Sequence, residues 1–376
     1  MKYFLIAGEA SGDLHGANLM QALKNEDRRA DFHFFGGDLM KAQGGVLKKH
    51  YSEMAFMGFI EVISHLSTIL KNLKQAKQDI LAYQPDVLIL IDFPGFNLKI
   101  AEFAKKNGIK IFYYISPKVW AWNQKRVLNI KKCVDRMFCI LPFEVDFYKT
   151  WGMEVDYVGN PLLDAIATNK VDADFRATYL LNEKPIIALL PGSRQQELKR
   201  LLPDMIQASD HFPTYQFVIA GAPTYTIKDY LPFIGERPVP IIFNQTYNLL
   251  LHAQAAIVTS GTATLETALL KVPQVVVYKG HPISVAIGRM LVRIKYISLV
   301  NLVMDKQVVK ELIQEACNPR SIKTEIHQLL ADADYRMQML TNYEHLAIRM
   351  GQAGASKKAA QLMIHYLKSV IINIHS

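Results

Sequence analysis

Short apolar runs recur along this chain, and most of them end at a polar turn containing glycine, serine or an acidic residue. The clearest unit, residues 255–278, reads as strand, turn, helix and strand, with Pro273 ending the helix. Strands that alternate with helices in this way build parallel sheets buried on both faces. The alternation stops after Gly159-Asn160-Pro161 and restarts at Pro185. We therefore expect an α/β protein with two doubly wound domains, joined by a linker near residues 164–184.

The expected elements follow from the same pattern. Strands are predicted at 2–7, 32–35, 86–91, 109–115, 137–141 and 155–158 in the first half, and at 185–190, 216–220, 241–243, 256–258, 274–278 and 297–300 in the second. Helices are predicted at 14–24, 98–106, 262–270, 308–315 and 354–367, with Leu14 as a core candidate. Neither GxGxxG nor GxxxxGK[ST] occurs, so a nicotinamide fingerprint and a P-loop are absent.

Composition narrows the setting. A chain of 376 residues is long enough for two cores, and no apolar run reaches the ~20 residues that span a bilayer. Residues 3–7 are too short for a signal-peptide core, so we expect a cytoplasmic protein. Cys133, Cys139 and Cys317 have no metal-binding spacing. The net charge of +9 favours an anionic partner, which composition leaves open among nucleic acid, a phosphorylated substrate and a membrane surface.

The turn Ser260-Gly261-Thr262 opens a helix with small residues, and no carboxylate follows before Glu266. Exposed N–H groups at a helix N-terminus attract anions, so this turn suits a phosphate. Glu266, one turn further on, is placed to accept hydrogen bonds from the two hydroxyls of a ribose. The alternative is an ordinary capped helix in an α/β sheet.

A second candidate anion site is Pro191-Gly192-Ser193-Arg194, which follows the strand at 185–190. Glycine lets the backbone approach a ligand closely, and Ser193 is a candidate cap for the next helix. Arginine at a helix N-terminus opposes the helix dipole, and a bound anion offsets that cost. The alternative is a solvated arginine.

In the first half, Asp92 stands at the carboxyl end of the apolar strand 86–91, where parallel sheets place their ligands. The segment 116–122 adds Lys118, Trp120 and Trp122, which suit a sugar and its phosphate but equally suit a loop cover.

Apolar and basic residues also crowd together at residues 48–66, where Met54, Phe56, Met57, Phe59 and Ile60 follow two lysines and a histidine. This pattern fits either a core face or an exposed patch for acyl chains or a membrane. Residues 283–296 have a similar basic, amphipathic pattern, which fits a membrane-surface helix or an ordinary surface helix.

Eight motifs coincide, in order and over nearly the whole chain, with those of one family. The motifs AGEASGD (7–13), IDFPGFN (91–97), SPKVWAW (116–122), LPFE (141–144), YVGNP (157–161), LPGSR (190–194), TSGTATLE (259–266) and YISLVN (296–301) resemble lipid-A-disaccharide synthase. The resemblance implies an inverting glycosyltransferase of the GT-B type with two Rossmann-like domains. It implies UDP-2,3-diacylglucosamine and 2,3-diacylglucosamine 1-phosphate (lipid X) as substrates, no cofactor, and no metal.

The resemblance also implies which residues act. The donor would bind in the second domain, with Arg194 at the diphosphate and Glu266 at the ribose. Further contacts would come from the residues beside them: Gly192, Ser193, Ser260, Gly261, Thr262, Thr264 and Asn301.

The acceptor would bind in the first domain, where a base must take the proton of its 6-hydroxyl. Asp92 is the first candidate, followed by Glu9, Asp13 and His15; alternatively, Asp92 braces its loop. Family members often carry a second aspartate where this chain has Gly95, and histidine where it has Asn160, so neither position supplies proton transfer here.

The resemblance further implies a peripheral protein on the cytoplasmic face of the inner membrane, a monomer or homodimer with no nucleic-acid partner. Lys118, Lys125 and Arg126 are candidates for the acceptor phosphate. The expected domains are 1–164, 165–345, and a C-terminal helix within 346–376 that returns to the first domain. Two rival interpretations stay open: another UDP-sugar enzyme, such as a 2-epimerase or N-acetylglucosaminyltransferase, and a non-catalytic nucleotide-binding or membrane-scaffold protein.

Overall fold

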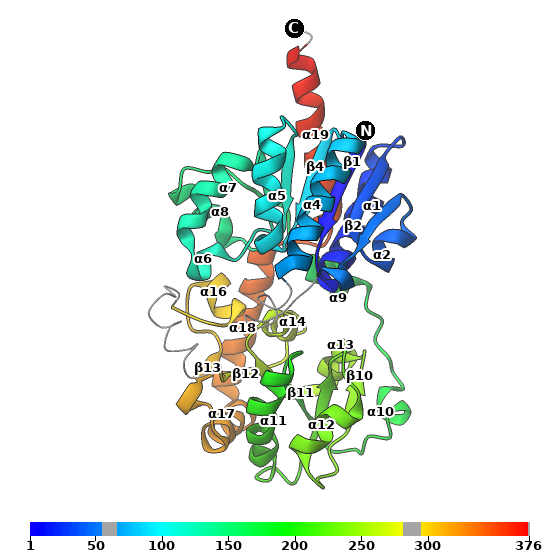
Figure 1. The fold of residues 1–376 in the computed structure, drawn as a ribbon. Helices are drawn as coiled ribbons and strands as arrows, with labels where there is room; N and C mark the ends of the chain where they lie inside the picture. Colours follow the sequence, from blue (N-terminus) through cyan, green and yellow to red (C-terminus); the bar gives the residue numbers. More distant parts are fainter. Residues whose placement is uncertain (55–65, 281–294, 375–376) are drawn as a thin grey trace. The chain divides into compact units, whose positions relative to one another are not determined.

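The computed structural model describes residues 1–54, 66–280 and 295–374. The chain divides into two compact units: residues 1–164 with 352–376, and residues 165–351 (Figure 1). The second unit therefore extends past residue 345, because α18 (Ala333–Met350) is one continuous helix.

The first unit is built on a parallel sheet in the order β3-β2-β1-β4-β5-β6-β7. Its strands are β1 (Lys2–Ala7), β2 (Asp31–Gly36), β3 (Val46–His50), β4 (Val87–Ile91), β5 (Ile111–Tyr114), β6 (Arg136–Cys139) and β7 (Asp156–Tyr157). Its helices are α1 (Ala10–Glu26), α2 (Asp38–Ala42), α4 (Leu66–Tyr83), α5 (Pro94–Lys106), α6 (Val119–Trp122), α7 (Val127–Cys133), α8 (Phe143–Thr150) and α19 (Ala355–Ile374).

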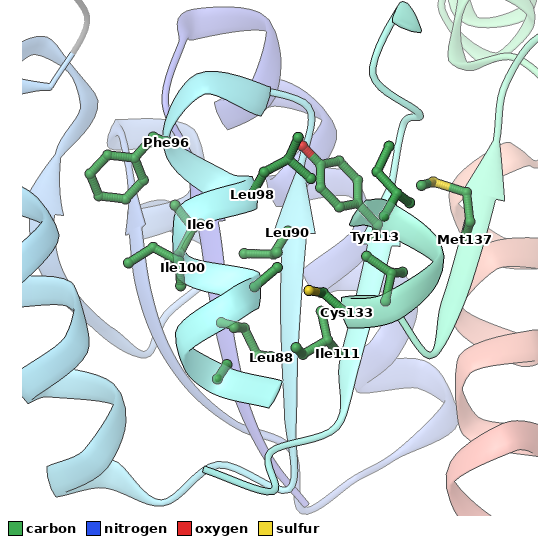
Figure 2. Close-up of a cluster of buried hydrophobic side chains, with 14 of the residues drawn as sticks. Ile6, Leu88, Leu90, Phe96, Leu98, Ile100, Ile111, Tyr113, Cys133 and Met137 are labelled. Atoms are coloured by element: carbon green, nitrogen blue, oxygen red, sulfur yellow. The ribbon is translucent and has the colours of Figure 1, made fainter. Parts of the chain in front are cut away.

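Both faces of this sheet are buried, as the continuous apolar strands predict. Leu88 and Leu90 point to the face that α4, α5 and α7 cover, and Figure 2 shows part of this cluster. Val87, Ile89 and Ile91 point to the opposite face, where α1 and the C-terminal helix α19 pack. Alternation along one strand thus supplies two cores.

The second unit has a six-stranded parallel sheet in the order β10-β9-β8-β11-β12-β13. Its strands are β8 (Ile186–Leu190), β9 (Gln216–Gly221), β10 (Ile241–Phe243), β11 (Ala253–Thr259), β12 (Gln274–Tyr278) and β13 (Lys310–Ile313). Its helices, besides α18, are α10 (Phe175–Thr178), α11 (Gln195–Ser209), α12 (Ile227–Ile234), α13 (Thr246–Leu251), α14 (Thr262–Leu269), α16 (Leu299–Met304) and α17 (Pro319–Ala331); α9 (Pro161–Thr168) contains the boundary between the units.

Two expected elements and one expected core residue are wrong. Residues 297–300, expected as a strand, lead into helix α16, and residues 308–315, expected as a helix, contain β13. A short apolar run is compatible with a helix or a strand, and residues 310–313 form a strand because they pair with β12. Leu14, expected in the core, is 45% exposed on α1.

No described helix is both long and apolar enough to cross a membrane.

Candidate active site

In the first unit the strand order reverses between β1 and β4, which pair in parallel with Ala7 opposite Ile91. The helix after β1 packs on one face of the sheet and the helix after β4 on the other. In doubly wound sheets ligands bind at the carboxyl ends of such strands. Glu9, the N-cap of α1, and Asp92 stand at these two strand ends.

The turn that carries Asp92 is strained and tightly held. Asp92 and Phe93 have φ angles of 42° and 49°, a left-handed conformation that non-glycine residues seldom adopt. The Nδ2 atom of the buried Asn97 donates to the carbonyls of Ile91 (3.2 Å) and Asp92 (2.9 Å). The Tyr113 hydroxyl donates to the Asp92 carbonyl at 2.5 Å. Such strain persists where the surroundings fix it, as at active sites.

The Asp92 carboxyl has an unusual proton affinity. Burial raises its pKa to about 6, while the nearby Lys118 ammonium lowers it and Glu9 raises it further. A carboxylate with a pKa near working pH is suited to accept a proton from a hydroxyl.

The other two base candidates differ sharply from each other. Asp13 is only 3% exposed, and its carboxylate accepts hydrogen bonds from the backbone N–H groups of Gly37 (2.7 Å), Leu39 (3.0 Å) and Met40 (3.0 Å). It fixes the start of α2 and, contrary to expectation, is not open to a substrate. Burial lowers the pKa of the half-buried His15 imidazole to about 4, so this ring is neutral near pH 7.

The segment after β5 divides into an exposed and a buried part. Lys118 is exposed at the N-cap of α6. Trp120 is only 6% exposed, and its Nε1–H donates to Glu144 at 3.2 Å. Trp120 therefore covers the loop from inside and is not an open surface for stacking a sugar. Trp122 ends α6, and Lys125 and Arg126 lie in the short turn of 3₁₀ helix that follows.

In the second unit the strand order reverses between β8 and β11, where Leu190 pairs with Val258. Both predicted anion turns, Gly192–Arg194 and Ser260–Thr262, follow these two strands. The structure therefore brings together, at one switch point, two turns that lie 68 residues apart in the chain (from Gly192 to Ser260).

The first of these turns is organised by Glu197, a residue that is not among the candidates predicted from the sequence. Glu197 Oε2 accepts the backbone N–H groups of Ser193 (3.0 Å) and Arg194 (3.2 Å), and Oε1 pairs with the Arg194 guanidinium (3.1 Å). Glu197, not Ser193, thus caps α11. A carboxylate three residues after an N-cap is a recognised capping signal, which the sequence contained. The Arg194 side chain remains 71% exposed.

Gly192 allows the Glu197 carboxylate to approach the backbone of this turn closely. Its φ of 106° suits glycine, and a Cβ there would lie 2.2 Å from Glu197 Oε2.

The second turn presents fewer open hydroxyls than expected. Ser260 Oγ donates to the Ile297 carbonyl at 2.8 Å and is half-buried. Thr264 is fully buried and donates to the Gly261 carbonyl at 2.8 Å, so its side chain is not available to a ligand. Gly261 is the N-cap of α14, and Thr262 is exposed at its first position.

Glu266 is partly exposed on α14 and accepts a hydrogen bond of 2.9 Å from the Tyr247 hydroxyl. Burial raises the pKa of Glu266, while the Tyr247 hydroxyl lowers it. Tyr247 lies on another helix, and no local pattern pointed to it.

Asn301 is fully buried, and its side chain hydrogen-bonds the segment that leads into β13. Its Oδ1 accepts the N–H groups of Val308 (2.7 Å) and Val309 (2.9 Å), and its Nδ2 donates to the Val309 carbonyl and to Glu311 (both 2.9 Å). The expectation that Asn301 contacts a donor sugar does not fit this arrangement.

Met54 is also a core residue, 3% exposed in the cluster beneath α4 and α5. Asn160, likewise buried, donates to the Ile140 carbonyl and accepts the Leu162 N–H, both at 3.0 Å. Phe56, Met57, Phe59 and Ile60 lie outside the described residues, as does most of the basic segment 283–296.

The fold is shared with several solved structures. The UDP-GlcNAc 2-epimerase from Neisseria meningitidis, bound to UDP-GlcNAc, matches with a TM-score of 0.70 at 13% identity, covering 97% of this chain and all of that one. CalG4, the calicheamicin glycosyltransferase, matches with a TM-score of 0.59 at 16% identity, covering 98% of each chain. The architecture is thus GT-B, as expected.

Sequence comparison gives the family. The model of the lipid-A-disaccharide synthetase family matches residues 3–365. The lipid-A-disaccharide synthase of Syntrophus aciditrophicus is 42% identical over 372 residues, 97% of each chain, and that of Coxiella burnetii strain CbuG_Q212 is 37% identical over 371 residues, 96% of this chain and 97% of the relative. The chain belongs to the lipid-A-disaccharide synthase family and is an enzyme of the glycosyltransferase type.

Proposed function

We propose that this enzyme transfers the diacylglucosaminyl group of UDP-2,3-diacylglucosamine to the 6-hydroxyl of 2,3-diacylglucosamine 1-phosphate. The acceptor oxygen forms a bond to the anomeric carbon, the bond from that carbon to the diphosphate breaks, and the hydroxyl proton passes to a base. The products are the β-1′,6-linked tetraacyl disaccharide 1-phosphate and UDP. The observation that carries the proposal is the chemical difference between the two switch points. The first unit has a candidate base there, and the second unit has groups suited to bind an anion and the two hydroxyls of a ribose.

The second unit would hold the donor. Arg194 presents a largely exposed guanidinium in the glycine-containing turn after β8, which suits a diphosphate. The N-terminus of α14 adds a partial positive charge that stabilises the departing UDP. Glu266 supplies the acceptor for the ribose hydroxyls. Arginine and helix dipole together support departure of UDP without a metal or another cofactor, which we propose as part of the mechanism.

The first unit would hold the acceptor, with Asp92 as the general base. Its raised pKa and its place at the β1–β4 switch point favour it over Asp13, which is buried and accepts three backbone N–H groups. The exposed Lys118 lies near enough to influence Asp92 and is suited to an acceptor phosphate.

Both substrates carry acyl chains, and the first unit offers a surface for a membrane. Leu66 and Leu70, one turn apart at the start of α4, are 51% and 55% exposed, and Lys71 and Lys74 are exposed beside them. Apolar side chains rimmed by lysines suit an anionic lipid interface. We propose peripheral binding to the cytoplasmic face of the inner membrane through this end of α4.

The test is a turnover assay with both purified substrates in detergent, with and without EDTA, measuring UDP and the disaccharide by mass. Disaccharide and UDP in equal amounts, at a rate unchanged by EDTA, are expected. UDP without disaccharide would indicate hydrolysis or another acceptor. Conversion of UDP-N-acetylglucosamine to its 2-epimer, without need of lipid X, would replace the proposal with the epimerase alternative.

A further inference from the structure

Tyr247 and Glu266 come from different helices and meet at the carboxyl edge of the second sheet. Tyr247 is the second residue of α13, and Glu266 is the fifth residue of α14. The Tyr247 hydroxyl donates to Glu266 Oε1 at 2.9 Å, and both side chains are partly exposed. Among the described residues, Tyr247 is the partner seen on this carboxylate, through one of its two oxygens.

The contact has a geometric consequence for a ligand. Glutamate has three side-chain torsions, and a partly exposed carboxylate samples several of them at an entropic cost to binding. A hydroxyl bound to Oε1 fixes the plane of the carboxylate and leaves Oε2 and the remaining lone pair of Oε1 as acceptors. A ribose presents two neighbouring O–H donors, which match two acceptors on one carboxylate.

The contact also has an electrostatic consequence. Burial disfavours the ionised form of Glu266, and the donated hydroxyl bond opposes that effect. An ionised carboxylate accepts stronger hydrogen bonds from sugar hydroxyls than a protonated one.

We propose that Tyr247 is a positioning residue for nucleotide recognition: it orients the Glu266 carboxylate so that the site selects ribonucleotides over 2′-deoxyribonucleotides. This inference rests on the proposed ribose role of Glu266. Tyr247 acts through Glu266 and touches no reacting atom, so the donor's binding depends on it and the chemical step does not.

The probes are UDP and 2′-deoxy-UDP, with affinities measured by calorimetry on the full chain. The variant Y247F removes one oxygen and keeps the ring. We expect it to weaken UDP binding about 3- to 10-fold, as the loss of one hydrogen bond does, with much less effect on 2′-deoxy-UDP. The KM for the UDP-sugar should rise by a similar factor while kcat stays within twofold.

The chain contains a matched control. In the same unit, the Tyr335 hydroxyl donates a hydrogen bond to Glu325 Oε1 at 2.6 Å. The next residue, Arg336, donates to the backbone carbonyl of Gln254, near the amino end of β11. This second tyrosine–glutamate pair therefore lies at the opposite edge of the sheet. The variant Y335F should leave both nucleotide affinities unchanged, and the thermal unfolding of the two variants shows whether a loss reflects stability alone.

A double-mutant cycle separates the inference from the function on which it rests. If E266Q abolishes the preference for UDP, and Y247F has no further effect in the E266Q background, the inference holds. If E266Q abolishes the preference but Y247F leaves it at the wild-type ratio, the inference is wrong and the ribose role of Glu266 stands. If E266Q keeps the preference, the ribose role fails and the inference fails with it.

Discussion

The side-chain amide of Asn97 donates a 2.9 Å hydrogen bond to the backbone carbonyl of Asp92, five residues earlier and on the other side of a left-handed turn. Tyr113 donates to the same carbonyl from the neighbouring strand β5. The turn is thus held through its backbone from two directions, while burial raises the pKa of the Asp92 carboxyl. This arrangement fixes the position of a proton acceptor through its backbone carbonyl, and a hydrogen bond from the Phe93 N–H to the carboxyl lowers its pKa against the effect of burial.

Replacing Asp92 with asparagine keeps the shape of the side chain and removes its basicity. We expect turnover to fall by about 10²–10⁴-fold, the usual contribution of a general base, with UDP affinity unchanged because the nucleotide would bind the second unit. The measurement is kcat together with UDP binding. The control is Asp38→Asn on α2, whose side chain is 87% exposed. Near-normal turnover of the Asp92 variant would leave Asp92 as a brace for its loop.

The acidity of Asp92 also predicts a pH profile. Its pKa is raised from the ordinary 3.8 to about 6, and the base must be ionised. We therefore expect kcat/KM to be close to its maximum about one unit above that pKa, to fall to half near pH 6, and to keep falling at lower pH. The profile is measured at fixed ionic strength over pH 4.5–8.5, bounds chosen to extend well past that pKa on either side. A profile that shows no half-fall near pH 6 and stays nearly level down to about pH 4.5 would contradict the assignment.

Arg194→Ala should reduce turnover by about 10²–10³-fold, because the proposed diphosphate would lose its arginine as negative charge develops. Arg237→Ala is the matched control, since Arg237 pairs with Asp210 at 2.9 Å on the surface of the same unit. It should change turnover less than twofold, in keeping with the small effect of exposed ion pairs. A loss below threefold in the Arg194 variant would remove its role at the diphosphate.

Asn301→Ala should act on stability. The side chain is fully buried with four hydrogen bonds. Its removal leaves the N–H groups of Val308 and Val309 without this acceptor, and takes one donor from the Val309 carbonyl and one from Glu311, so we expect about 2–4 kcal/mol of destabilisation. Denaturant unfolding measures this loss. Activity per folded molecule should stay within threefold. A variant of normal stability with a raised KM for the donor would instead show that Asn301 takes part in donor binding.

The membrane proposal is tested on α4. Serine at both Leu66 and Leu70 should weaken cosedimentation with anionic liposomes without lowering the unfolding temperature, because both side chains are already more than half exposed. Leu81→Ser, at the far end of the same helix and 47% exposed, is the control and should bind liposomes normally. Equal binding by all three proteins would place the lipid contact elsewhere.

The sequence predicted most of the sheet because buried parallel strands are continuous apolar runs that need little context. Residues 274–278 appear in the structure with the expected bounds as β12. Residues 308–315 were misassigned because a short mixed run has no decisive period, and its pairing with β12 is a long-range event. Asn301 stands in a family motif, but only the structure shows that the side chain turns inward to hold that pairing strand.

The sequence by itself determined the class of fold and singled out the two candidate anion turns and the candidate base, because each depends on residues that are neighbours in the chain. Tertiary structure decided which of those side chains remain open. Asp13, Thr264 and Trp120 carry suitable groups, but buried polar atoms must be paired, and their partners in the structure lie inside the protein. It also paired Tyr247 with Glu266, which lie 19 positions apart in the chain. Such contacts arise from how helices pack on a sheet, which local periodicity does not encode.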